Sequence, residues 1–187
     1  MIHSSRFIAV LDANVLYPAP LRDYLLHLAS LELYKPTWTK DIQEEWIRNL
    51  LINRSDLKRE NLEITQDAMN SAFPDANITN YEELISSLSL PDDKDRHILA
   101  AAIRGNADVI VTFNLKDFPP DYLKLYDIEV QDPDEFVSNI INLDKLKAEN
   151  ALQNQIRSLR NPPKTRDEVL QTLKKCGLTN SVSMLND

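Results

Sequence analysis

The stretch from Pro91 to Pro119 reads PDDKDRHILAAAIRGNADVIVTFNLKDFP, and it decides the fold. It predicts a helix that begins after the N-cap residue Asp92, carries apolar residues at helical spacing and ends at Gly105. Residues 108–112 are apolar and β-branched, which is typical of a buried strand. Residues 113–117 then form a polar loop. A helix that leads into a buried strand, with acidic residues at the helix start and beyond the strand end, is half of an α/β active site.

Length and composition allow one domain, or one domain with an extension. The chain has 187 residues, of which 43% are hydrophobic, so it can build a sizeable core. No apolar run approaches the ~20 residues that a membrane span needs. The beginning of the chain lacks the pattern of a signal peptide. One cysteine and three histidines leave no cysteine-based zinc cluster and no intrachain disulfide. We therefore expect a cytoplasmic protein without membrane contact.

The net charge of −8 argues against binding nucleic acid through a broad basic surface. It does not exclude a nucleic-acid substrate. A cluster of carboxylates can hold divalent cations, and those cations can receive a phosphate.

The rest of the chain continues the alternation of strands and helices. Residues 7–11 predict a buried strand that ends at Asp12, and a helix beginning after Asp132 is expected to extend to about Arg160. This alternation predicts a mainly parallel sheet, in which ligands bind outside the carboxyl ends of the strands. We expect a main α/β domain at residues 1–141 and a helical C-terminal extension at 142–187.

Acidic residues from distant parts of the chain are predicted to meet at this edge of the sheet. Asp12 ends one strand, and Asp117 follows another. Asp95 lies in the first turn of the helix that leads to the second strand, and Glu45 lies on an early helix. Such carboxylates would repel one another strongly unless a cation lay among them. Hard oxygen ligands favour Mg²⁺ or Mn²⁺.

Each of these residues also has a simpler explanation. Asp12 can be a turn former at a strand end, and Asp92 and Asp95 can be helix caps and dipole partners. Glu45, next to another glutamate, can belong to a solvated helix face, and His97 is expected on a helix surface. The evidence for a shared site lies in the combination of these acidic residues and in their order along the chain.

The combination resembles the PIN-domain family, and VapC-type toxins in particular. The resemblance covers about residues 5–135 and rests on three motifs with a glutamate-bearing helix among them: VLDAN (10–14), DxxDRxILAAA (92–102) and VIVTFNxxDFP (109–119). The tail, with NPPKTRDEVL (161–170) and CGL (176–178), resembles an extension found on larger VapC-like proteins.

The resemblance implies a three-layer α/β/α PIN-like fold with a C-terminal helical appendage, and a Mg²⁺- or Mn²⁺-dependent endoribonuclease. It implies catalytic roles for Asp12, Glu45, Asp95 and Asp117, metal ligation by Asp12, Asp95 and Asp117, and support from Asn14, Thr112, Asn114 and Asp92. Two alternatives stay open within it. Glu44 can replace Glu45, and Asn114 stands where the family usually has its last acid, with Asp117 as the stand-in.

The resemblance also implies partners. These are an RNA substrate, a cognate antitoxin protein if the chain is the toxin of a type II toxin–antitoxin system, and a possible homodimer. Two other functions remain: a structure-specific DNA nuclease, and a catalytically inactive PIN-like module that binds a protein.

Overall fold

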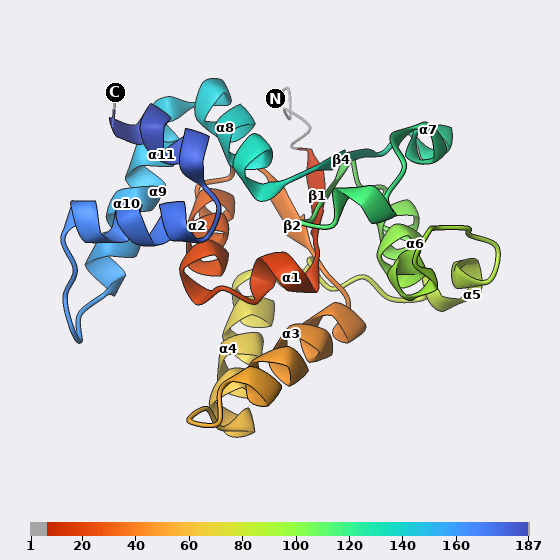
Figure 1. Ribbon diagram of the computed structural model, residues 1–187, viewed down its shortest axis with the longest axis horizontal. Helices are drawn as coiled ribbons and strands as arrows, with labels where there is room; N and C mark the ends of the chain where they lie inside the picture. Colours follow the sequence, from red (N-terminus) through yellow and green to blue (C-terminus); the bar gives the residue numbers. More distant parts are fainter. Residues whose placement is uncertain (1–6, 187) are drawn as a thin grey trace.

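Four short parallel strands form the centre of the computed structural model, which describes residues 7–186 (Figure 1). They are β1 (Ile8–Leu11), β2 (Lys35–Thr37), β3 (Val109–Val111) and β4 (Glu129–Gln131), in the order β2-β1-β3-β4. The two central strands are almost entirely buried and consist of apolar residues, as strands covered on both faces must be. The predicted parallel sheet is confirmed.

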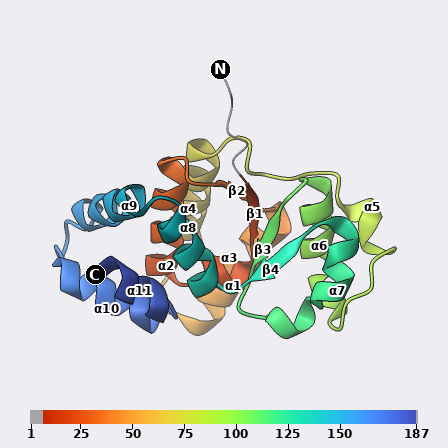
Figure 2. The same ribbon diagram turned by 90° about the horizontal axis from the view of Figure 1, so that it is seen from above.

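Helices cover both faces of this sheet, so the predicted three-layer α/β/α fold is confirmed (Figure 2). One layer contains α2 (Ala19–Ser30), α8 (Pro133–Leu143) and α9 (Lys145–Ser158); the other contains α5 (Glu82–Ile85), α6 (Arg96–Arg104) and α7 (Pro120–Leu123). Near the carboxyl ends of the strands lie α1 (Ala13–Leu16), α3 (Lys40–Asn53) and α4 (Arg59–Ala72). Three short 3₁₀ turns connect these elements: η1 (Asp93–Asp95), η2 (Leu115–Asp117) and η3 (Lys124–Tyr126).

The strand register brings two polar residues together. Leu11 of β1 lies opposite Val111 of β3, so the next residues, Asp12 and Thr112, are neighbours at the sheet edge. The Asp12 backbone N–H donates to the Val111 carbonyl at 3.1 Å, which continues the ladder by one bond. The residues that follow the two strands therefore meet by sheet geometry alone.

The start of α3 is fixed by a cap. The Thr39 hydroxyl accepts a hydrogen bond from the Ile42 backbone N–H at 3.1 Å. This places Trp46 in the core, where the structure buries it fully. Glu45, next to it, lies at the border between core and solvent.

A buried arginine joins three helices beneath the strand ends. The Arg22 guanidinium of α2 lies 4.7 Å from the Trp46 ring centroid, a cation–π contact. It also donates to the Leu16 carbonyl of α1 at 2.8 Å. These contacts hold α1, α2 and α3 in one arrangement, and so fix where α3 presents its outer face.

The helix predicted from Asp132 to about Arg160 is interrupted, so that prediction was wrong. Asp144 has extended backbone angles, with φ −155° and ψ 88°, and its side chain accepts from the Lys147 backbone N–H at 2.9 Å. An aspartate followed three residues later by a free N–H is a helix N-cap, so α8 ends and α9 begins here. The domain boundary predicted between residues 141 and 142 falls inside the last turn of α8, and the division into two domains stays a prediction.

The C-terminal helices share the core of the rest of the molecule. Ala148, Ala151 and Leu152 of α9 are fully buried against it. The Tyr24 hydroxyl of α2 donates to the Ala148 carbonyl at 3.2 Å. The last two helices, α10 (Arg166–Lys175) and α11 (Thr179–Asn186), complete this layer, and Thr165 and Glu168 form a capping box at the start of α10. None of the helices in residues 7–186 is long and apolar enough to cross a membrane.

The turn between α10 and α11 is built on a glycine. Gly177 has φ +102°, which L side chains rarely adopt, and a Cβ placed on it would lie 3.2 Å from Cε1 of Phe113. Phe113 directly follows Thr112, so the C-terminal helices contact the loop after β3.

We predict that Gly177→Ala lowers the free energy of unfolding by about 1–2 kcal/mol, because the backbone conformation is strained for alanine and the new methyl group crowds the Phe113 ring. Chemical denaturation measures this. Ser183→Ala, at an exposed position of α11, is the control and should change stability by less than about 0.5 kcal/mol. Equal effects of the two substitutions would contradict the role of the glycine.

Candidate active site

Asp12 is the buried carboxylate of the site. Its side chain follows β1 and is only 4% exposed. Its Oδ2 atom accepts from the Thr112 hydroxyl at 2.6 Å and from Asn14 Nδ2 at 2.7 Å. Burial raises the pKa of Asp12 to about 6; the hydrogen bond from Thr112 lowers it, and the negative charge of Glu45 raises it further. Asp12 is thus a charge held in place by donors rather than a simple turn former.

Thr112 and Asn14 connect the ends of β1 and β3. The Thr112 hydroxyl accepts from Asn14 Nδ2 at 3.1 Å and from the Asn114 backbone N–H at 3.0 Å. Asn14 Oδ1 accepts from the Phe113 backbone N–H at 3.1 Å. The loop after β3 is therefore tied to the residue pair at the end of β1. Asn14 and Thr112 thus lie within hydrogen-bond distance of the Asp12 carboxylate, and their supporting role stays a prediction.

Asp95 is the second central carboxylate. It lies at the junction of η1 and α6, it is half-buried, and its buried Oδ2 atom has no hydrogen-bond partner within residues 7–186. Burial raises the pKa of Asp95 to about 7, and the charges of Asp12, Asp92, Asp117 and Glu45 add to the rise. Four other carboxylates therefore act on Asp95 at this edge of the sheet.

The structure separates the two glutamates that the sequence left open. Glu44 is exposed and forms a two-point ion pair with Arg59 of α4, at 2.8 and 3.0 Å. Glu45 faces His97 of α6 instead. Its Oε2 lies 3.8 Å from Nε2 of His97, and its charge acts on both Asp12 and Asp95. The geometry therefore favours Glu45 as the glutamate of the site.

His97 differs from the expectation of a helix-surface residue. Its side chain is only 17% exposed, it faces Glu45, and burial lowers its pKa. Its Nδ1 atom is buried without a hydrogen-bond partner among the described residues. His97 lies next to the site because it faces Glu45 on a separate helix, α3. The local sequence around His97 gives no signal for that contact.

The remaining predicted site residues lie at the rim. Asp117 ends η2, where its backbone N–H donates to the Asn114 carbonyl at 3.0 Å. The Asn114 side chain is exposed, so its link to the site runs through its backbone. Asp92 caps η1 by accepting from the Lys94 backbone N–H at 2.9 Å. Asp92 therefore caps η1 and also places a negative charge near Asp95.

The donor set suits a hard divalent cation. All candidate ligands are carboxylates, and Asp95 offers a buried oxygen with an unused lone pair. In the described part of the chain, no group of three or more histidine, cysteine or acidic side chains is already arranged as a metal cage. The carboxylates thus converge on one region without closing on a single point, and a cation would have to draw them closer.

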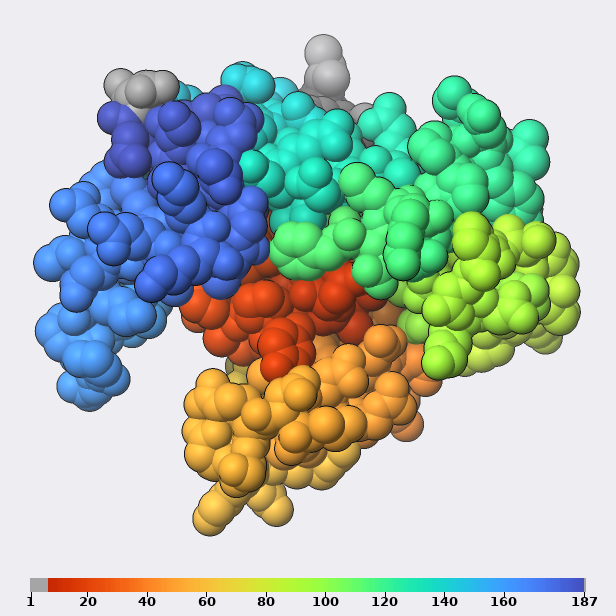
Figure 3. All heavy atoms as spheres, viewed as in Figure 1, coloured from red at the N-terminus to blue at the C-terminus, as the bar shows by residue number. Residues whose placement is uncertain are grey.

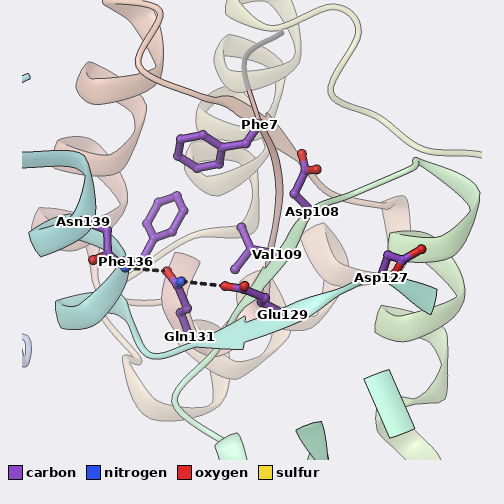
Figure 4. A pocket seen from close by; sticks show the side chains of 8 residues that line it. All are labelled: Phe7, Asp108, Val109, Asp127, Glu129, Gln131, Phe136 and Asn139. Atoms are coloured by element: carbon purple, nitrogen blue, oxygen red, sulfur yellow. Dashed lines mark hydrogen bonds between the residues drawn. The ribbon is translucent and has the colours of Figure 1, made fainter. Parts of the chain in front are cut away.

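The molecule also has a cavity of about 390 Å³ that contains none of these residues (Figure 4). Its lining is Phe7, Asp108, Val109, Asp127, Glu129, Gln131, Phe136 and Asn139. Several of its polar side chains bond to one another or to backbone. Asp108 accepts from the Ile8 N–H at 2.6 Å, and the Gln131 amide donates to Glu129 at 3.3 Å. Size alone therefore does not mark the functional site.

Comparison with known proteins agrees with this geometry. Residues 8–116 match the family model described as "PIN domain", and residues 133–187 match the model described as "VapC50 C-terminal domain". A protein of Mycobacterium tuberculosis described as "Putative ribonuclease VapC50" is 39% identical over 93 residues. That match covers 50% of this chain and 54% of the relative, so the chain spans about half the length of the curated relative it matches. No solved structure matches the chain significantly.

We predict that Asp95→Asn stabilises the fold near pH 8 and that this gain disappears near pH 4. The folded-state pKa of about 7 lies above the ordinary value of 3.8, so the folded protein binds the proton more tightly than the unfolded chain. Stability is therefore lost as pH rises towards 7, and asparagine avoids the loss. Because the side chain is only half-buried, we expect a gain of about 1–2 kcal/mol from denaturation curves.

Glu44→Gln is the control for this measurement. The ion pair with Arg59 lowers the pKa of Glu44, so its removal should give no gain at high pH. A stabilisation of the Glu44 variant equal to that of the Asp95 variant would mean that general surface charge, and not the site, causes the effect.

Proposed function

Since the chain belongs to the PIN-domain family, we propose that it is a divalent-metal-dependent endoribonuclease of the VapC type. One observation carries this proposal: the charges of four carboxylates, Asp12, Glu45, Asp92 and Asp117, act on Asp95 at the carboxyl ends of parallel strands, and the charge of Glu45 also acts on Asp12. Such a concentration of negative charge costs stability, and a bound cation would offset the cost.

We propose that Asp12, Asp95 and Asp117 hold Mg²⁺ or Mn²⁺. The bound ion would acidify a water molecule and stabilise negative charge on the phosphoryl oxygens. Thr112 and Asn14 keep the Asp12 carboxylate in one orientation through their hydrogen bonds at 2.6 and 2.7 Å. Asp92 adds negative charge beside Asp95 and holds η1 in place through its cap.

Glu45 is assigned as the group that accepts a proton from the attacking water. It is partly exposed, and it lies close enough to Asp12 and Asp95 for its charge to affect both. The water oxygen would form a bond to phosphorus while the bond to the 3′ oxygen breaks. The leaving 3′ oxygen would take a proton from solvent water, which leaves a 5′-phosphate and a 3′-hydroxyl. His97 is assigned as a positioning residue that limits where the Glu45 side chain can move.

The biological setting follows as part of the same proposal. As the toxin of a type II toxin–antitoxin system, the protein would be inhibited by a cognate antitoxin. A basic side chain of the antitoxin that enters the acidic region would compete with the cation and the substrate. We further propose residues 1–141 as the nuclease domain, with residues 142–187 as its helical extension.

We predict that Asp12→Asn and Asp95→Asn each reduce Mg²⁺- or Mn²⁺-dependent cleavage of RNA by at least about 100-fold, because each removes a negative ligand of the ion. Cleavage of an end-labelled RNA on denaturing gels measures this. Glu44→Gln should retain activity near that of the unmodified chain. Undiminished cleavage by a folded Asp12 or Asp95 variant would contradict the site.

A second prediction concerns metal binding without catalysis. Mn²⁺ should raise the melting temperature of the unmodified chain, because an ion that binds only the folded state stabilises it, and EDTA should reverse the rise. The shift should vanish in Asp95→Asn and persist in Glu44→Gln. An equal shift in the Asp95 variant would place the ion elsewhere.

A further inference from the structure

The acidic net charge of the chain is not spread evenly. Residues 142–187 contain eight lysines and arginines against five aspartates and glutamates, a net charge of +3. Residues 1–141 contain 13 against 24, a net charge of −11. A basic segment attached to an acidic nuclease domain suggests a division of tasks, since carboxylates can hold cations while basic side chains can contact phosphates directly.

The basic segment meets the candidate active site at one junction. A Cβ on Gly177, between α10 and α11, would lie 3.2 Å from the Phe113 ring. Phe113 follows Thr112, and its backbone N–H donates to Asn14 at 3.1 Å. Figure 3 shows the segments side by side: the blue C-terminal helices border the green segment after β3, and the red segment after β1 lies next to both. The junction is thus one residue away from the hydrogen bonds that hold Asp12.

Two lysines lie directly before this junction. Lys174 and Lys175 occupy the last turn of α10, both are exposed, and neither has an ion-pair partner within residues 7–186. Arg166, at the other end of α10, is engaged internally, because it pairs with Glu149 and donates to the Leu185 carbonyl at 2.6 Å. The lysines complement the negative end of the helix dipole, but this leaves their outer N–H groups available.

Phe113 provides an apolar surface at the same place. Phe113 is 43% exposed although a Cβ on Gly177 would lie 3.2 Å from its ring, and Leu115 on the same loop is 38% exposed. An exposed aromatic ring close to basic residues and to a candidate phosphate-cleaving site suits the binding of single strands, in which bases stack on rings while the backbone follows positive charge.

We propose that the end of α10 and Phe113 form the binding edge for single-stranded RNA, with Lys174 and Lys175 contacting backbone phosphates and Phe113 stacking on a base next to the cleaved bond. This inference rests on the proposed nuclease function and adds to it the path of the substrate. It assigns the C-terminal extension a direct part in substrate binding.

The test measures binding separately from cleavage. In the Asp95→Asn background, which removes a proposed metal ligand, anisotropy of a labelled single-stranded RNA gives the dissociation constant at several salt concentrations. Adding Lys174→Gln and Lys175→Gln should weaken binding about tenfold near 0.1 M salt and reduce the slope of log K against log salt by about 1.4, or about 0.7 for each lost phosphate contact. Adding Phe113→Leu instead should weaken binding about tenfold with little change of slope.

The matched control is the pair Lys145→Gln and Lys147→Gln. These lysines are also exposed and on the same extension, but Lys145 lies beside Met184, near the opposite end of α11 from Gly177. The control removes the same charge and should leave affinity and slope unchanged. Equal losses in both lysine pairs would show a general charge effect and overturn the proposal, as would full affinity in the Lys174 and Lys175 variant.

The proposed nuclease function is judged by a different result, the cleavage activity of the unmodified chain. If that chain binds RNA through the α10 edge but does not cut it, the nuclease proposal fails and the binding edge remains. If it cuts RNA and the α10 variant binds as tightly as its parent, the nuclease proposal stands and the binding edge is wrong.

Discussion

Electrostatic repulsion among carboxylates at the ends of β1 and β3 is the constraint on which the rest of the structure depends. Asp12 is held by Thr112 and Asn14, whereas Asp95 keeps a buried oxygen with no partner among the described residues. Leaving a buried acceptor without a hydrogen bond costs about 1–3 kcal/mol, which the surrounding core must supply. Such a cost is typical of sites built for binding, because a fold that needed only stability would use a neutral side chain here.

The sheet and the meeting of its polar ends could be predicted from local patterns. Buried β-branched runs alternating with helical periodicity lead to parallel strands, and parallel strands place their carboxyl ends at one edge. Asp12 and Thr112 are then neighbours once the two strands pair. Helix N-caps could also be predicted from the sequence, because an aspartate before a proline predicts a helix start. Asp132 indeed accepts from the Asp134 and Glu135 N–H groups at 2.8 and 3.0 Å.

Contacts between distant elements could not be predicted. Glu44 and Glu45 are adjacent, and only the position of Arg59 on the next helix shows which of them is neutralised at the surface. His97 enters the site because Glu45, more than fifty residues earlier, faces it. The interruption at Asp144 was missed because the apolar pattern continues across it, and the cap competes with helix continuation through a single side chain. The meeting of Phe113 with Gly177 leaves no local pattern, because it depends on how two layers stack.

The fully buried alanines of α9 have a consequence for how this protein can be dissected. Small side chains let α9 pack closely on α2, and the Gln155 amide donates to the Pro20 carbonyl across that seam at 2.9 Å. Deletion of the C-terminal helices would expose the apolar surface of α2 that α9 covers. The Pro20 carbonyl would also lose its hydrogen bond from Gln155. The C-terminal helices are therefore part of the packed core of the molecule, and a shortened chain would lose part of that core.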